Sequence, residues 1–127
     1  CDIVVTAGPI LKEPHATIQA DWLEKGAFAS PVDFDSYWHP DAFAQADKFC
    51  TDDIAQLRYY QEVGYFQSIP VVHADLGELV AGKRPGRERD DERTMCCNLG
   101  LAIDDIATAV LIYQRAVEQG IGTWLPL

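Results

Sequence analysis

Three short apolar runs, each followed by polar residues, mark the first half of the chain. They cover residues 2–8, 27–35 and 47–53. Apolar runs of this length, bounded by turn-forming or acidic residues, are typical of buried strands in a parallel sheet. The second run is the most informative, because its strand is predicted to extend to about Phe34 and to open without a turn onto Asp33 and Asp35. Open α/β sheets bind ligands at the carboxyl ends of their strands, so three such ends predict a ligand-binding or catalytic site.

Helical signals separate and follow these strands. The predicted helices cover residues 39–46, the segment from a cap at Thr51 or Asp52 to Gly64, residues 73–82, and a long final segment that ends at Gly120. In the first of them, Pro40 occupies the first helical position. Connections of this length favour parallel pairing with right-handed crossovers, so the sequence predicts an α/β fold.

The final helix has the clearest pattern. Its apolar positions recur at helical spacing and form one stripe, made of Ile103, Ile106, Ala107, Val110 and Val117. Asp104 and Asp105 lie at its positively polarised amino end. Asn98 is predicted to cap this helix, with a contact to a cofactor as the alternative.

Composition narrows the class of protein. The chain has 127 residues, 48% of them hydrophobic, which is enough for one core and one domain. A net charge of −10 argues against a nucleic-acid surface. No apolar run approaches the roughly 20 residues of a membrane span, and no secretory leader is recognised. The four cysteines lack disulfide spacing, so we expect a reduced, cytoplasmic protein without a membrane partner.

The chain begins without Met, inside a predicted strand. We therefore expect a fragment whose amino-terminal part is missing, with a processed or trimmed small domain as the alternative. No Gly-x-Gly-x-x-Gly fingerprint is present. If this is a dinucleotide-binding domain, its phosphate-binding half is not among these residues.

Asp35 is the first candidate for chemistry. Phe34, Tyr37 and Trp38 would partly desolvate its carboxyl group, which raises the pKa toward the range useful for general acid–base catalysis. The alternative is a turn or helix cap. Asp33 precedes Asp35 by two positions and in an extended backbone would face the same side, although a solvated surface acid is the simpler interpretation.

Other groups carry weaker signals. Asp33, Asp35 and His39 could bind a metal, but such a set arises easily by chance, His39 suits a helix cap before Pro40, and we expect no metal site. The cysteines at 50, 96 and 97 are interpreted as small buried apolar residues. Residues 83–93 hold five cations among four acids, which predicts an exposed, ion-paired loop.

Several motifs together resemble the ornithine cyclodeaminase/mu-crystallin family. They are Asp2–Ala7, Gly26–Asp35, Leu76–Arg87, Gly100–Asp105 and Gly120–Leu127. The most specific is Leu-Gly-Glu-Leu-Val-Ala-Gly at residues 76–82. The resemblance runs from end to end and implies that residues 1–127 are the carboxyl-terminal part of an NAD(P)-binding Rossmann domain, ending in a long helix and a short tail. The implied fold class is α/β, part of a Rossmann-like doubly wound parallel sheet with flanking helices, its first nucleotide-binding half absent.

The resemblance also implies an activity: NAD- or NADP-dependent conversion of an amino or imino acid. Hydride transfer at the alpha carbon gives an imine, and deamination or cyclisation follows. Asp35 matches the catalytic, substrate-contacting aspartate of the family's Gly-x-Asp-x-Pro-Gly-Lys segment. The positions that match contacts to the cofactor are Thr6, Ala7, Pro31, Val32, Asp33, Phe34, His39 and Asn98. Leu99 matches a residue that touches substrate.

The chain also departs from that family pattern. Asp35 is followed by Ser36-Tyr37-Trp38-His39 in place of Pro-Gly-Lys, and Asp33-Phe34 replaces small residues. This bulk would reshape the pocket, which puts ornithine as the substrate in question. The alternatives are a non-catalytic NAD(P)- or small-ligand-binding protein of the mu-crystallin type, or an inert fragment. We expect a homodimer or higher self-association, because an unprotected parallel sheet edge recruits other chains.

Overall fold

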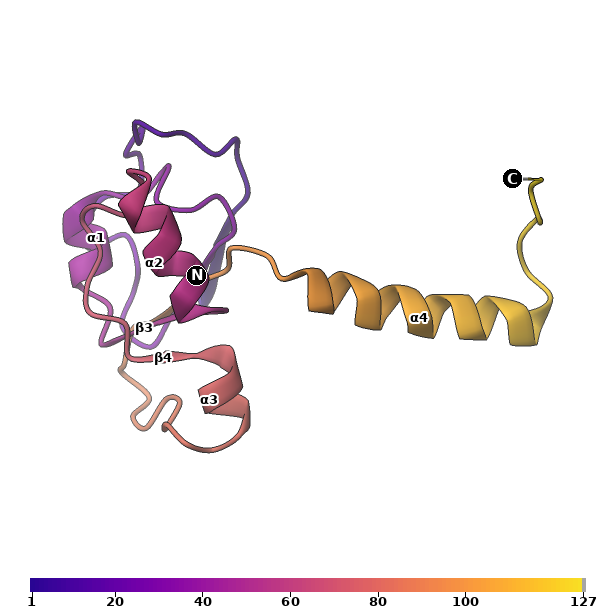
Figure 1. Ribbon diagram of the computed structural model, residues 1–127. Helices are drawn as coiled ribbons and strands as arrows, with labels where there is room; N and C mark the ends of the chain where they lie inside the picture. Colours follow the sequence, from indigo (N-terminus) through magenta and orange to yellow (C-terminus); the bar gives the residue numbers. More distant parts are fainter. Residues whose placement is uncertain (127) are drawn as a thin grey trace.

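The computed structural model describes residues 1–126, so Leu127, the last residue of the predicted tail, lies outside the described residues. The elements follow one another along the chain as β1 (Ile3–Thr6), β2 (Phe28–Pro31), α1 (Pro40–Ala44), β3 (Lys48–Thr51), α2 (Ile54–Glu62), β4 (Ala74–Asp75), α3 (Leu76–Val80), β5 (Thr94–Cys97) and α4 (Ala102–Gln119). Figure 1 shows a body that contains the sheet and α1–α3, and the long helix α4, which extends away from it.

The five strands form one sheet in the order β1-β2-β5-β3-β4. Every strand pair is parallel, with Val4 beside Ala29 and Cys50 beside Cys96 in the register. The parallel α/β prediction is therefore confirmed. All strands end at the same edge of the sheet, which brings the segments after β1, β2, β3 and β5 together.

Helices cover both faces of the sheet. On one face, buried residues of α1 and α2, such as Phe43 and Leu57, pack with Phe49 of β3 and Met95 of β5 in the main core. The other face carries a smaller cluster, in which Leu79 of α3 packs against Cys50, Ala74 and Cys96. Successive strand side chains point to opposite faces, so Cys96 lies in the small cluster while its neighbours Met95 and Cys97 lie in the main core.

Two strands were not predicted. Thr94–Cys97, expected to lead straight into the final helix, forms β5 between β2 and β3. The segment predicted as a helix over 73–82 begins instead with strand β4, and its helix, α3, starts at Leu76. Asp75 ends β4 and caps α3 in a capping box with Glu78, which explains why the helix cannot start earlier.

Helix caps both confirm and correct the sequence analysis. His39 caps α1, and Pro40 stands at its start as predicted. The cap of α2 is Asp53, not Thr51 or Asp52: its carboxylate accepts from the amide of Gln56 at 2.6 Å. Asn98 does not cap α4, because that helix begins after Leu101 and receives no side-chain cap.

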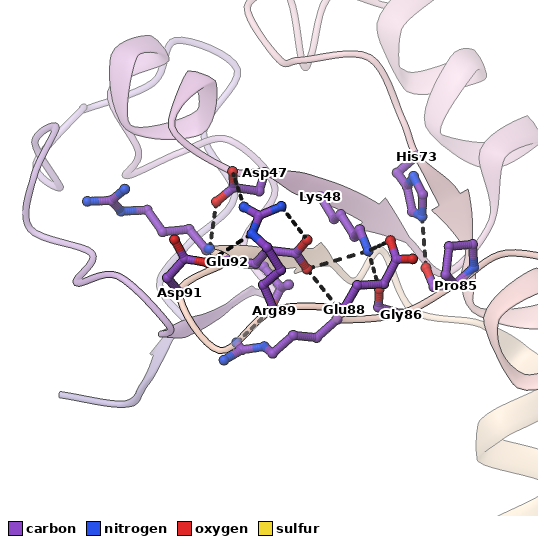
Figure 2. Close-up of polar contacts among 12 residues, drawn as sticks. Asp47, Lys48, His73, Pro85, Gly86, Glu88, Arg89, Asp91 and Glu92 are labelled. Carbon is purple, nitrogen blue, oxygen red and sulfur yellow. Dashed lines mark hydrogen bonds and ion pairs between the residues drawn. The ribbon is translucent and has the colours of Figure 1, made fainter.

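The predicted ion-paired loop is confirmed, and it is anchored to β3 (Figure 2). Lys48, almost fully buried, pairs with Glu88 at 2.6 Å and with Glu92 at 3.4 Å. Arg89 pairs with Glu92 at 3.3 Å and with Asp91 at 3.0 Å. Glu92 is itself buried, so the loop is not simply a solvated surface segment.

The apolar stripe of α4 is exposed. Ile103 is 70% and Ile106 is 64% exposed, and no residue of α4 is buried. Gly120 ends the helix in the left-handed conformation, as predicted. Among residues 1–126, no helix is both long enough and apolar enough to cross a membrane.

Candidate active site at the carboxyl ends of the strands

The ends of three neighbouring strands lie side by side. The amide of Val32 donates to the carbonyl of Thr6 at 3.0 Å, and the amide of Asn98 donates to the carbonyl of Pro31 at 2.9 Å. This brings Thr6, Ala7, Pro31, Val32 and Asn98 into one row across β1, β2 and β5. Ala7 is exposed and Val32 is 42% exposed, so this row presents an open surface.

Asp33 lies beneath this row and is fully buried. Its carboxylate accepts hydrogen bonds from the hydroxyl of Thr6 at 2.7 Å and from the amide of Gly8 at 2.9 Å. The Thr6 hydroxyl in turn accepts from the indole N–H of Trp38 at 2.9 Å. The expectation of a solvated surface acid is therefore wrong: Asp33 joins the loop after β1 to the segment after β2.

Gly8 lies against the ring of Tyr37. A Cβ atom at this position would lie 2.5 Å from Cε2 of Tyr37, closer than non-bonded atoms approach. Tyr37 and Asp33 thus hold the same loop from two sides. The loop that follows β1 is fixed in place by residues that follow β2.

The chain turns sharply between the two acids. Phe34 has φ of 61°, in the left-handed region that non-glycine residues rarely adopt. Its ring is buried against Tyr60, Tyr65 and Phe66, at centroid distances of 4.7, 5.4 and 4.9 Å. The prediction of an extended backbone with Asp33 and Asp35 on one side is therefore wrong. Asp33 contacts the β1 loop, whereas Asp35 contacts the segment after α2.

The carboxyl group of Asp35 is nearly buried, with the residue 8% exposed. Oδ2 accepts from the amide of Phe66 at 2.9 Å, whereas Oδ1 is buried with no hydrogen-bond partner among the described residues. Burial raises the pKa of Asp35 above its ordinary value, and the hydrogen bonds with backbone amides offset only part of this effect. A carboxyl group of this kind can hold or release a proton closer to neutral pH.

Asp35 lines a cavity of about 330 Å³. Polar groups around it come from Lys12, His39, Gln67 and Ser68, and its apolar wall includes Trp38 and Phe43. His39 therefore lies beside Asp35, apart from the row of strand ends. Its Nδ1 accepts from the amide of Asp41 at 3.3 Å, which is the capping role considered from the sequence.

Asn98 and Leu99 follow β5. The side-chain amide of Asn98 donates to the hydroxyl of Ser30 at 2.9 Å, across to β2. The amides of Leu99 and Gly100 both donate to one carboxylate oxygen of Asp52, each at 2.7 Å. The loop after β5 is therefore held on one side by β2 and on the other by the segment after β3.

Three contributors to this site were missed by sequence reasoning. Lys12 lies in an irregular loop, and nothing in its sequence context points to the cavity. Phe66 acts through its backbone amide, which leaves no sequence signal. Asp52 was interpreted only as a possible helix cap, although a pair of acids directly after a strand could have indicated a second role.

The residues considered for metal binding do not come together as a site. Among residues 1–126, no group of three His, Cys, Asp or Glu side chains has an arrangement that could hold a metal ion. Asp33 and Asp35 contact different segments, which separates the proposed ligands. The four cysteines are free thiols; Cys50, Cys96 and Cys97 are buried, as expected.

Comparison with known proteins gives a consistent result. The sequence profile of the ornithine cyclodeaminase/mu-crystallin family matches residues 1–120. N-((2S)-2-amino-2-carboxyethyl)-L-glutamate dehydrogenase of Staphylococcus aureus is 40% identical over 99% of this chain and 38% of its own length. Alanine dehydrogenase of Archaeoglobus fulgidus is 31% identical over 97% of this chain and 40% of its own length.

Solved structures agree in fold. The Thermococcus litoralis Delta(1)-pyrroline-2-carboxylate reductase in complex with NADH and L-proline has a TM-score of 0.69 and 29% identity, over 97% of this chain and 39% of that one. An archaeal alanine dehydrogenase dimer with bound NAD has a TM-score of 0.72 and 27% identity, over 100% of this chain and 41% of that one. The chain thus spans about two fifths of the length of these relatives.

Proposed function

The chain belongs to the ornithine cyclodeaminase/mu-crystallin family, and from this membership we propose that it is the carboxyl-terminal part of an NAD(P)-binding Rossmann domain in a longer enzyme. That enzyme converts an amino or imino acid by hydride transfer at the carbon that carries the nitrogen. The names of its relatives support this substrate class, because alanine, pyrroline-2-carboxylate and the substituted glutamate each join nitrogen and a carboxylate to one carbon.

The strand ends suit the nicotinamide end of such a cofactor. Ala7 and Val32 offer an exposed apolar surface at adjacent strand ends, and the loop around Gly8 is held rigid by Asp33. The backbone of Pro31–Phe34 and the side chain of Asn98 complete the proposed contacts, with His39 in the cavity that Asp35 lines. When bound, the cofactor accepts or donates the hydride.

The buried Oδ1 of Asp35 is the single observation that carries the proposal. A buried acceptor without a partner costs stability, so its presence beside a cavity is favoured if a ligand supplies a donor. An amine nitrogen or a water molecule placed next to Oδ1 supplies one. Asp35 then takes the proton as the carbon–nitrogen double bond forms, or as water attacks the substrate imine, and returns it in the reverse direction.

The test is Asp35→Asn in the longer protein. Asn keeps the size of the side chain and an oxygen for the Phe66 amide but cannot carry the proton. We expect kcat to fall by about two orders of magnitude or more, with NAD(P) affinity nearly unchanged. Asp90→Asn, which removes an exposed acid, is the control.

Unchanged turnover in Asp35→Asn would remove Asp35 from the mechanism. Tight cofactor binding with no turnover of any amino or imino acid by the unmodified protein would favour a non-catalytic binder of the mu-crystallin type. Calorimetric titration with NAD and NADP, together with an activity screen over amino acids, separates these outcomes.

The same proposal includes self-association and a compartment. In this chain taken alone, β1 forms an open edge of the sheet, with Ile3 62% exposed, which favours contact with other chains. α4 also exposes its apolar stripe. We propose a homodimer or higher assembly on this basis. Three buried free thiols suit a reducing compartment such as the cytoplasm.

A further inference from the structure

A carboxylate outside the predicted set holds the loop that follows β5. Asp52 is the residue after β3, is 7% exposed, and uses both of its oxygens. Oδ2 accepts from the amides of Leu99 and Gly100, each at 2.7 Å. Oδ1 accepts from the amide of Asp53 at 3.0 Å and from the hydroxyl of Thr51 at 3.2 Å.

The geometry of this contact is specific. The amides of Leu99 and Gly100 converge on one carboxylate oxygen, and Gly100 has φ of 89°, in the left-handed region that favours glycine. Converging backbone N–H groups bind anions, and here the anion is a side chain of the same protein. Hydrogen bonds to an ionised carboxylate are shorter and stronger than those between neutral groups.

The held loop contacts both β2 and the main core. Asn98 reaches Ser30 of β2, and Leu99 packs against the main core. Gln56 of α2 adds a contact to the carbonyl of Gly100 at 3.3 Å, so the segment after β3 fixes both faces of the turn. Movement of Asp52 would therefore move Asn98, matched to a cofactor contact, and Leu99, matched to a substrate contact.

We propose that Asp52 is a positioning residue, which sets the loop Asn98–Gly100 for cofactor and substrate through its paired bonds with the Leu99 and Gly100 amides. This inference rests on the proposed function, because that function places Asn98 and Leu99 at the ligands. The neighbouring acid offers a matched control: Asp53 is one position away but caps α2, and Asn is an equally good cap residue.

The experiment compares Asp52→Ala, Asp52→Asn and Asp53→Asn in the longer protein, at a temperature where each is folded. We expect Asp52→Ala to lower kcat/KM for the amino acid by about 100-fold, the effect of a misplacement of about 1 Å. Asp52→Asn keeps one oxygen for the two amides and should lose roughly tenfold, which is partial rescue. Asp53→Asn should stay within about twofold of the unmodified enzyme.

A second readout does not depend on activity. Hydrogen exchange of the Leu99 and Gly100 amides should accelerate in Asp52→Ala and remain slow in Asp53→Asn. NAD affinity, measured by calorimetry, should likewise weaken in Asp52→Ala and change little in Asp53→Asn. If Asp52→Ala fails to fold, Asp52→Asn and its exchange rates decide the question. Unchanged kinetics and NAD affinity in both Asp52 variants, with only a lower Tm, would overturn the proposal.

Asn98→Ala and Leu99→Ala distinguish the positioning role of Asp52 from the proposed function. If they impair binding or turnover while the Asp52 variants do not, the positioning role is wrong and the proposed function stands. If none of these variants changes binding or turnover, the loop is not part of the site and the positioning role is wrong, while Asp35→Asn still tests the proposed function. An effect of Asp52 without any effect of Asn98 or Leu99 would also overturn positioning through this loop.

Discussion

The two carboxyl oxygens of Asp35 have different surroundings. One is paired with the Phe66 amide and the other is buried without a partner among the described residues. Desolvation is the largest cause of its raised pKa. The buried carboxyl group of Asp35, proposed for proton transfer, therefore also lowers the stability of the folded state, as is common at functional sites.

This cost predicts a pH-dependent stability. Because the pKa of Asp35 is raised on folding, the native state binds more protons than the unfolded state between the ordinary value of 3.8 and the raised value. Stability from this group therefore falls as pH rises through that window. Asp35→Asn removes the charge, so its effect on stability should be more favourable at pH 7 than near pH 3.5.

Thermal unfolding of Asp35→Asn and the unmodified chain across pH 3.5–7 checks this. Asp90→Asn should show no comparable gain, since Asp90 is exposed. A variant whose stability relative to the unmodified chain is no more favourable at pH 7 than near pH 3.5 would show that the ionised carboxylate is favourable in the fold.

Among the elements, β3 is held by charges at its first residue. Lys48 pairs with Glu88 and Glu92, and the Glu92 carboxylate also accepts from the Glu88 amide at 2.9 Å (Figure 2). That amide, followed by the charge of Lys48, lowers the pKa of Glu92 below 4.5. The Lys48 contacts, led by the one with Glu88, raise the pKa of the lysine.

A lowered carboxyl pKa gives stability that is present above pH 4.5 and lost as pH falls through the native value. We therefore expect Glu92→Gln to lower Tm by several degrees at pH 7, with the difference shrinking toward pH 3. Glu62→Gln, at the exposed end of α2, should have little effect. Equal Tm values for Glu92→Gln and the unmodified chain at pH 7 would argue that this network adds no stability.

The elements also show what the sequence could and could not predict. The strand Lys48–Thr51 was predicted because a short run ends in Thr and two acids, and that pattern is local. β5 has a similar character but follows a charged loop and precedes a strong helix, so its local signals were attributed to the helix. Its place between β2 and β3 depends on crossover topology, which a single sequence does not contain.

In the candidate site, too, features with a local sequence pattern were predicted, and features that depend on tertiary contacts were not. The strand ends that bring Thr6, Pro31 and Val32 together were predicted because apolar runs ending in polar residues mark that edge. The turn at Phe34 was missed, since its left-handed conformation is stabilised by aromatic rings from α2 and the segment after it. Contacts made through backbone amides, such as that of Phe66, could not be predicted at all.

At the scale of the whole molecule, apolar surface is unevenly covered. The main core is well packed, whereas α4 exposes its stripe and β1 exposes Ile3 and Val5. Apolar patches of this kind, next to an open sheet edge, favour association.

We therefore expect the 127-residue chain, prepared alone, to self-associate at micromolar concentration. Ile106→Lys with Val110→Lys should weaken association at least tenfold, about 1.4 kcal/mol, by placing charges in the stripe. Thr108→Lys, elsewhere on the same helix, is the matched control. Analytical ultracentrifugation measures the effect, and a monomer at all concentrations would contradict the expectation.

The outward course of α4 also bears on how the chain melts. A helix of 18 residues with none of them buried depends mainly on its own hydrogen bonds and propensities, and such helices are marginal in water. In a monomer, α4 would lose its structure gradually over a broad temperature range while the sheet and its helices unfold together in a sharp transition. A single unfolding free energy would then describe the body of the protein but not the whole polypeptide.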